Sequence, residues 1–139
     1  NLGSMDFACQ VANCKLIVVL GHSKCGAIKG ACDHIEMGNL TELLSKIQPA
    51  VYQETETSNQ RNSNNPQFVE NVSIINVKRS VRNIIERSYV LEQLLESGAI
   101  GIVGAMHNIE TGKVTFYDDV TFIKDEINPD FSFAKVRSN

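Results

Sequence analysis

Residues 16–27 read Leu-Ile-Val-Val-Leu-Gly-His-Ser-Lys-Cys-Gly-Ala, and this stretch decides the predicted fold. Its first five residues are all apolar, which is typical of a strand that is covered on both faces in a parallel sheet. Gly21 ends the apolar run, and the residues after Cys25 are expected to begin a helix. The order strand, loop, helix places the side chains of His22 and Cys25 beyond the carboxyl end of a strand, where α/β sheets build their sites.

Hydrophobic periodicity predicts the other elements. Helical spacing of apolar residues is found in 4–12, 27–38, 39–47, 66–85 and 88–98. Ser4, Asn39 and Ser88 are the expected N-caps of three of these helices. Residues 100–106 are predicted to form a second buried strand, and residues 114–117 alternate as expected for an antiparallel edge strand.

The sequence therefore predicts an α/β fold with a mostly parallel sheet, flanking helices and an antiparallel edge strand. Residues 1–139 show no internal repeat and no linker, so we expect a single domain. Residues 55–65 carry no apolar side chain and are expected to form a loop, whereas the tail after Asp118 has no clear period.

Composition and charge exclude several classes of partner. The chain has 139 residues, of which 42% are hydrophobic and 21% are charged, as in ordinary globular proteins. The net charge is −3 and the basic residues form no run, so we expect no nucleic-acid partner. The longest apolar run, residues 16–20, is too short to cross a bilayer, and we expect no direct membrane insertion.

The four cysteines, Cys9, Cys14, Cys25 and Cys32, are clustered in the first quarter of the chain. A disulfide scaffold would distribute its cysteines more widely, and no secretory signal is visible. We therefore predict a reducing, cytoplasmic location, with these residues as thiols or metal ligands. Cys9, Cys14 and Cys32 fall on apolar faces or at the end of an element, where a thiol is commonly a small buried hydrophobe.

His22 and Cys25 are the leading candidates for a chemical site. Imidazole and thiolate are both ligands that zinc prefers, and a thiolate is favoured at the amino end of a helix. Two ligands do not complete a zinc site. Two other interpretations stay open, namely a small buried thiol beside a hydrogen-bonded histidine, and a nucleophilic Cys25 with His22 as its base.

A phosphate loop is a further possible interpretation of the same stretch. Gly21 and Gly26 match the first part of such a loop, but Ala27 and Ile28 stand where its lysine and hydroxyl residue belong. Nucleotide hydrolysis is therefore not expected.

The other polar candidates are weaker. His34 is expected at the C-terminal end of a helix, where it would interact with the helix dipole. His107 ends a strand, and the Asp118-Asp119 pair is expected in a solvated loop.

Several segments together resemble the β-class carbonic anhydrases, and the most specific of them is the block at residues 16–27. The supporting matches are Gly-Ser-Met-Asp-Phe-Ala at 3–8, Lys-Gly-Ala at 29–31, Asn-Val at 71–72, Gly-Ile-Val-Gly-Ala-Met at 101–106 and Thr-Gly-Lys-Val at 111–114. The resemblance implies the fold of that family and its activity, the zinc-dependent reversible hydration of CO₂ to bicarbonate.

In that family, two cysteines and one histidine hold the zinc ion, and water or an aspartate takes the fourth position. The resemblance implies that His22 and Cys25 are two of the three permanent ligands. The third, a cysteine, belongs to a Cys-x-Asp-x-Arg motif whose aspartate and arginine orient the zinc-bound water, and no such motif occurs in residues 1–139. We therefore expect an amino-terminally truncated chain that lacks the first strands and the Asp-Arg pair, binds zinc weakly or not at all, and does not hydrate CO₂.

The resemblance also places the missing first strand beside residues 16–20 in the sheet. An apolar strand without that neighbour is a template for association, so we expect a homodimer or a higher homo-oligomer. The alternative is a non-catalytic domain that uses this fold for binding or assembly, for example as part of a transporter. The polypeptide before Asn1 discriminates between the two, because a Cys-x-Asp-x-Arg motif there supports the enzyme.

Overall fold

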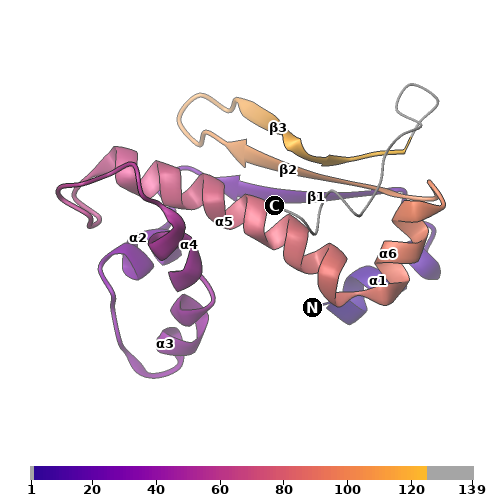
Figure 1. The fold of residues 1–139 in the computed structure, drawn as a ribbon, viewed down its shortest axis with the longest axis horizontal. Helices are drawn as coiled ribbons and strands as arrows, with labels where there is room; N and C mark the ends of the chain where they lie inside the picture. The colour runs from indigo at the N-terminus through magenta and orange to yellow at the C-terminus, as the bar shows by residue number, and fades with distance from the viewer. Residues whose placement is uncertain (1, 125–139) are drawn as a thin grey trace. The chain divides into compact units, whose positions relative to one another are not determined.

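The computed structural model describes residues 2–124, and Figure 1 labels the helices and strands found there. The helices are α1 (Leu2–Gln10), α2 (Gly26–Cys32), α3 (Gly38–Ser45), α4 (Gln48–Gln53), α5 (Pro66–Arg87) and α6 (Tyr89–Glu96). The strands are β1 (Leu16–His22), β2 (Gly101–His107) and β3 (Val114–Phe122). None of the helices in the described range combines the length and apolar character that a bilayer-spanning segment needs.

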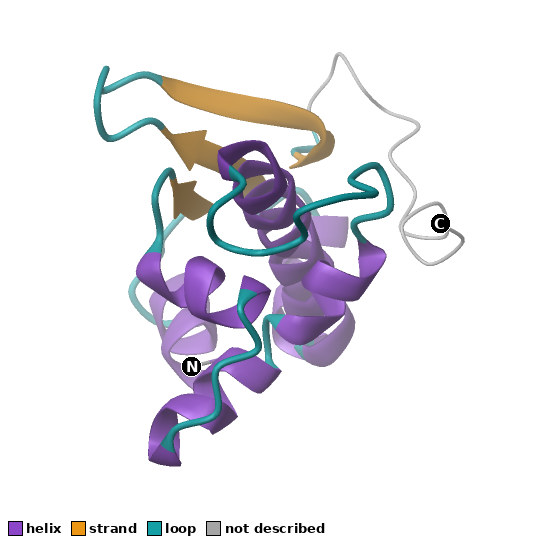
Figure 2. Ribbon diagram, turned by 90° about the vertical axis from the view of Figure 1, so that its left-hand side faces the viewer, coloured by secondary structure: helices purple, strands orange, loops and turns teal. Residues whose placement is uncertain are grey.

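The predicted α/β fold is confirmed. The three strands form one sheet in the order β1-β2-β3. The arrows for β1 and β2 point the same way in Figure 1, and Ser23 N donates a 2.9 Å hydrogen bond to the His107 carbonyl just beyond their ends. β3 returns in the opposite direction, and Figure 2 shows the short loop that joins it to β2. The sheet is therefore parallel between β1 and β2, with β3 as its antiparallel edge strand.

The chain divides into two compact units. Among the described residues, unit 1 contains residues 2–19, Ser80–Ala105 and residues 116–124, and unit 2 contains Leu20–Arg79 and Met106–Thr115. The core of unit 1 consists of Cys9, Val81, Ile85, Leu91, Leu95, Ile100, Ile102, Val120 and Phe122. His22 and Cys25 both belong to unit 2.

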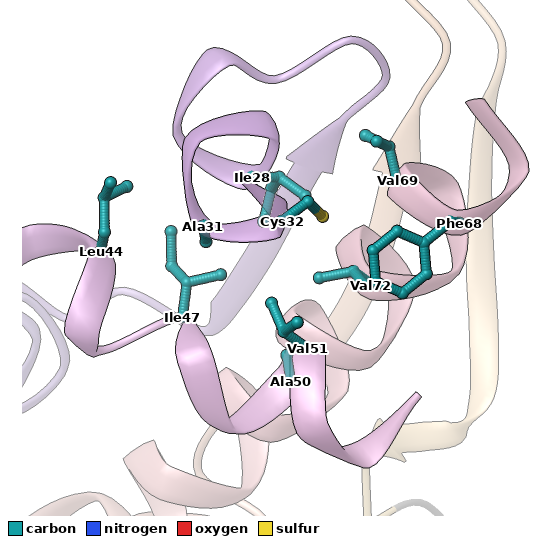
Figure 3. Packing of buried hydrophobic residues seen from close by; sticks show 10 residues of the cluster. All are labelled: Ile28, Ala31, Cys32, Leu44, Ile47, Ala50, Val51, Phe68, Val69 and Val72. Carbon is teal, nitrogen blue, oxygen red and sulfur yellow. The ribbon is translucent and has the colours of Figure 1, made fainter. Parts of the chain in front are cut away.

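The core of unit 2 lies between α2, α3, α4 and α5, and Figure 3 shows the side chains of its residues. Its buried residues are Ile28, Ala31, Cys32, Leu44, Ile47, Ala50, Val51, Phe68, Val69 and Val72. Burying large apolar side chains of this kind contributes about 1.5–3 kcal/mol each. This cluster therefore fixes α2, and with it the residue that precedes α2, Cys25.

The burial of β1 differs from the prediction. Alternate residues of the strand are exposed, and Leu16, Val18 and Leu20 are 50%, 46% and 52% exposed. The expectation of a strand covered on both faces is therefore wrong for the described chain. β1 lies at an edge of the sheet, and an all-apolar run does not say whether the atoms that cover it belong to the same chain. β2, the central strand, is buried as predicted.

The predicted helices and strands are present, and the differences concern their ends and α4, which was not predicted as a separate helix. Ser88 caps α6 as predicted, since its Oγ accepts a 3.1 Å hydrogen bond from Leu91 N. Ser4 and Asn39 lie inside α1 and α3, so the prediction that they are N-caps is wrong. α3 instead begins at Gly38, and Met37 is its N-cap. The backbone N–H of Met37 donates a 2.7 Å hydrogen bond to the hydroxyl of Thr41.

The last strand is longer than expected. Asp118 and Asp119 lie within β3, which continues to Phe122, so the prediction of a solvated loop there is wrong. Both aspartates are nevertheless exposed. The tail that showed no clear period falls mostly in residues 125–139, which lie outside the described residues.

A buried carboxylate fastens the polar loop before α5. Glu54 is 2% exposed. Arg61 Nη1 donates to its Oε2 at 2.6 Å, and Thr57 N and Asn71 Nδ2 each donate to its Oε1 at 3.1 Å. Burial by itself raises the pKa of Glu54, but these hydrogen bonds outweigh burial and hold the pKa below its ordinary value. The Arg61 guanidinium also lies 4.7 Å from the centroid of the Phe68 ring.

Replacing Glu54 with Gln should lower the free energy of unfolding by about 1–3 kcal/mol at pH 7, because the Arg61 guanidinium loses its charged partner. An unfolded glutamate has a pKa of about 4.3. The pKa of Glu54 is lower in the folded chain than in the unfolded chain. The ionised carboxylate therefore stabilises the fold fully when the pH is above the unfolded pKa. This stabilisation is lost as the pH falls through the folded pKa. Urea denaturation at neutral and acid pH measures both effects.

Glu42→Gln is the matched control for this prediction. Glu42 is an exposed carboxylate that lies 3.6 Å from Lys46 in an i,i+4 pair. Removing its charge should change the free energy of unfolding by less than about 0.5 kcal/mol. Equal losses in the two variants would contradict a special contribution from the buried carboxylate.

Candidate metal-binding site

His22 and Cys25 lie at the two ends of the same turn in unit 2. His22 is the last residue of β1, and Cys25 is the N-cap of α2 with an extended backbone (φ −63°, ψ 122°). The Cys25 side chain makes no capping hydrogen bond to the helix. The predicted order of strand, turn and helix is therefore confirmed. The convergence of the two side chains on one ion stays a prediction.

The hydrogen bonding of His22 leaves one ring nitrogen for a metal. Its Nδ1 lies 2.9 Å from the carbonyl oxygen of Ser23. A carbonyl oxygen only accepts hydrogen bonds, so this contact requires the proton on Nδ1 and leaves the lone pair on Nε2. Metal-binding histidines commonly donate their second N–H to a backbone carbonyl in this way. Because His22 is exposed, an ion can reach it from solvent.

Three contacts fasten this turn to the connection between β2 and β3. Ser23 N donates to the His107 carbonyl at 2.9 Å, and Ile109 N donates to Ser23 Oγ at 3.0 Å. Lys24 Nζ lies 2.5 Å from Glu110 Oε1. Lys24 has a φ of +57°, a left-handed conformation that is uncommon outside glycine. The turn is therefore held by backbone pairing, a hydroxyl and an ion pair together.

Close packing explains the glycine that precedes His22. A Cβ atom at Gly21 would lie 2.5 Å from the sulfur of Met106 and 2.6 Å from Cγ2 of Val77. Both distances are shorter than non-bonded atoms tolerate, so the backbone of β1 approaches its neighbours here as only glycine allows.

The described residues place two zinc donors at this turn and no third. Within residues 2–124, no three or more side chains of His, Cys, Asp or Glu are grouped so that they could hold a metal ion. An imidazole nitrogen and a thiol sulfur fit zinc in type, but a catalytic zinc site needs three protein ligands. If His22 and Cys25 bind zinc as predicted, other residues would have to complete the site.

The other cysteines do not supply the missing ligand. Cys9 and Cys32 are buried as predicted, whereas Cys14 is exposed, against the expectation. Burial, and to a smaller degree the nearby Asp33 carboxylate, raises the pKa of Cys32 to about 11. Figure 3 shows the Cys32 sulfur within the apolar cluster of unit 2. A thiol in that environment stays protonated and is a poor ligand or nucleophile.

The remaining histidines lie outside the turn. His34 follows α2 with a φ of +52°, and its ring centroid lies 6.3 Å from that of Tyr52. His107 ends β2, and its carbonyl is the acceptor for Ser23 N. Glu110 was not among the residues predicted for the site, because its contact with Lys24 joins positions 86 residues apart and leaves no local pattern.

The fold and this turn together define an α/β protein with an imidazole and a thiol at the two ends of one turn, beyond the carboxyl end of a parallel strand. The sequence profile of the carbonic anhydrase family matches residues 1–114. The chain therefore belongs to the β-class carbonic anhydrase family.

Curated relatives and solved structures agree with this assignment. Carbonic anhydrase 2 of Mycobacterium tuberculosis is 28% identical over 131 residues, which are 91% of this chain and 60% of the relative. The carbonic anhydrase of Mycolicibacterium smegmatis is 27% identical over 118 residues, or 81% of this chain and 54% of the relative. The chain thus spans little more than half of the length of these relatives.

Among solved structures, the β-carbonic anhydrase CafA of Aspergillus fumigatus superposes with a TM-score of 0.72 at 22% identity, covering 100% of this chain and 65% of that one. One of two tetrameric β-carbonic anhydrases of Sordaria macrospora superposes with a TM-score of 0.71 at 18% identity. The match covers 84% of this chain and 58% of that one. At these identities the likeness shows the shared fold.

Gly21→Ala should lower the free energy of unfolding by about 1–3 kcal/mol, because the added methyl group overpacks the contact with Met106 and Val77. Gly26→Ala is the control, since a Cβ there meets no atom within 4 Å. That variant should keep or slightly raise stability. Chemical denaturation of both variants measures the difference, and equal stabilities would contradict the close approach at Gly21.

Proposed function

We propose that the protein to which this chain belongs catalyses the reversible, zinc-dependent hydration of CO₂ to bicarbonate, with His22 and Cys25 as two of the metal ligands. Membership of the carbonic anhydrase family supports the reaction. The observation that supports the ligand role is the hydrogen bond from His22 Nδ1 to the Ser23 carbonyl, because it leaves Nε2 as the basic nitrogen.

Each residue of the turn has a separate part in this proposal. A bound zinc ion lowers the pKa of its water from about 15.7 to about 7, which supplies hydroxide at neutral pH. The Ser23 carbonyl fixes the orientation of the His22 ring. Cys25 lies at the N-cap of α2, where the core of unit 2 fixes the start of the helix. Together they would present one nitrogen and one sulfur at the carboxyl end of β1.

We further propose that residues 1–139 alone bind zinc weakly and do not hydrate CO₂ above the uncatalysed rate. The Cys-x-Asp-x-Arg motif of the family does not occur in this sequence. The third ligand and the Asp-Arg pair that orients the zinc-bound water would therefore have to come from residues outside it.

A second candidate function is a non-catalytic domain that uses this fold for binding or assembly, for example in a transporter. The observation that favours it is the grouping of only two zinc donors within the described part of the chain. The two candidates differ in one respect that can be checked, since only the enzyme requires Cys-x-Asp-x-Arg elsewhere in the whole polypeptide.

Zinc analysis and stopped-flow CO₂ hydration test the proposed function. The chain supplied with zinc should hold less than one ion per molecule and should show no turnover above buffer, because a third ligand is missing. His22→Ala should lower the zinc content further. His34→Ala, which removes an exposed histidine outside the turn, should leave the zinc content unchanged.

Two results would contradict these statements. Turnover by residues 1–139 alone would contradict the proposed inactivity. If a longer protein with Cys-x-Asp-x-Arg holds zinc stoichiometrically and fails to hydrate CO₂, the enzyme proposal is wrong and the assembly domain is favoured.

We also propose that the chain forms a homodimer or a higher homo-oligomer. Leu16, Val18 and Leu20 are each about half exposed along β1, at an edge of the sheet. An apolar edge strand favours pairing with another chain. The Sordaria macrospora relatives are described as tetrameric.

Light scattering at micromolar concentration tests this assembly. Val18→Lys places a charge on the exposed face of β1 and should shift the chain toward the monomer. Tyr52→Lys is the control, because it places a charge at an exposed position of α4, outside β1. It should not change the molar mass that light scattering measures. A monodisperse wild-type monomer would contradict the proposal.

A further inference from the structure

A pocket lies in unit 2, beside the turn that carries His22 and Cys25. Its volume is about 270 Å³. It is lined from the turn by Ser23 and Lys24, from α2 by Lys29, from the first turns of α5 by Glu70 and Ser73, and from the β2–β3 connection by Asn108 and Glu110. Neither candidate zinc ligand belongs to its lining. The pocket is therefore separate from the proposed metal site.

An unpartnered hydroxyl lies in the wall of this pocket. Ser73 is 4% exposed, and its Oγ has no hydrogen-bond partner among the described residues. A buried hydroxyl without a partner destabilises a folded protein by about 1–3 kcal/mol. Since Ser73 lines the pocket, a ligand in the pocket can supply the missing hydrogen bond.

The other uncharged groups of the wall are left as donors. Ser23 Oγ accepts a hydrogen bond from Ile109 N at 3.0 Å, so its proton is free to point elsewhere. Asn108 Oδ1 accepts from the N–H groups of Glu110 and Thr111 at 2.9 and 3.1 Å, which leaves the amide NH₂ of Asn108 as the available group. A ligand rich in acceptor oxygens fits these groups.

The two lysines and the two glutamates of the wall balance in formal charge, and Lys29 is the cation that is left for an anion. Lys24 and Glu110 neutralise one another across 2.5 Å. Lys29 is exposed and forms no ion pair with any described residue, so its ammonium group is available to a ligand. Glu70 is the one lining carboxylate that no described cation neutralises, and it opposes an anion from the exposed surface of α5.

We propose that this pocket binds a small oxyanion, held by the Lys29 ammonium, the hydroxyls of Ser73 and Ser23, and the amide of Asn108. The bond to the ammonium is charge-assisted, and the hydroxyl and amide groups fix the position of the oxygens. The inference goes beyond the proposed CO₂ hydration and requires no metal, so it holds or fails independently of zinc binding.

Inorganic phosphate is the probe for this site. Metal-free protein is titrated with phosphate at constant ionic strength, and the backbone amide resonances of the pocket are followed by NMR. Saturable shifts should be centred on Ser23, Ser73 and Asn108. Lys29→Ala should raise the dissociation constant by about tenfold, the loss of one charge-assisted hydrogen bond. Lys46→Ala removes an exposed lysine charge outside the pocket, at the C-terminal end of α3, and should leave the constant unchanged.

Ser73→Ala separates binding from folding. Because Ser73 Oγ has no described partner, its removal should not lower the melting temperature of the free protein. The same variant should weaken phosphate binding by about three- to tenfold, since one neutral hydrogen bond is lost.

Glu70→Gln tests whether the pocket favours a negatively charged ligand. It should tighten phosphate binding by about two- to fivefold, because an exposed like charge is removed. Unsaturable shifts, shifts that spread over the surface, or equal effects of Lys29→Ala and Lys46→Ala would overturn the proposal. Weaker phosphate binding by Glu70→Gln would also overturn it.

Discussion

The hydrogen bond from Ser23 N to the His107 carbonyl holds the end of β1 to the end of β2, and the candidate site depends on it. It continues the pairing of two parallel strands into the turn that carries His22 and Cys25. The hydroxyl of the same serine then accepts from Ile109 N, so one residue fixes the turn through both its backbone and its side chain. Gly21 allows this arrangement, because a Cβ atom there would lie so close to the side chains of Met106 and Val77 that one of the elements or side chains would have to shift.

The parts of the structure that the sequence predicted correctly are those that depend on neighbouring residues. The strand at residues 16–20 and the cap at Ser88 each have a local cause. The placement of His22 and Cys25 on either side of one turn has the same origin, because a strand end and a helix start bound it. The family resemblance, confirmed by the profile match, rested on that same local stretch.

The parts that the sequence could not predict arise from contacts between distant residues. Nothing around Lys24 indicates that Glu110 pairs with it, and nothing around Ser73 indicates that its hydroxyl lies unpartnered in a pocket wall. The exposure of alternate residues in β1 has a different cause, since the sequence shows that the strand is apolar but not that one of its faces is uncovered in this chain. Ser4 was misplaced for a smaller reason, because α1 already begins at Leu2.

The Glu54–Arg61 ion pair also bears on how the chain tolerates changes of length. The guanidinium of Arg61 reaches Glu54 and the carbonyl of Val51, and so closes the loop at its base. Residues 58–60, between these anchors, are exposed. Doubling the length of a flexible loop costs only about 0.6 kcal/mol in closure entropy. Extra residues at this tip would therefore leave the helices around it in place, and an inserted epitope or reporter there would leave the turn at His22 undisturbed.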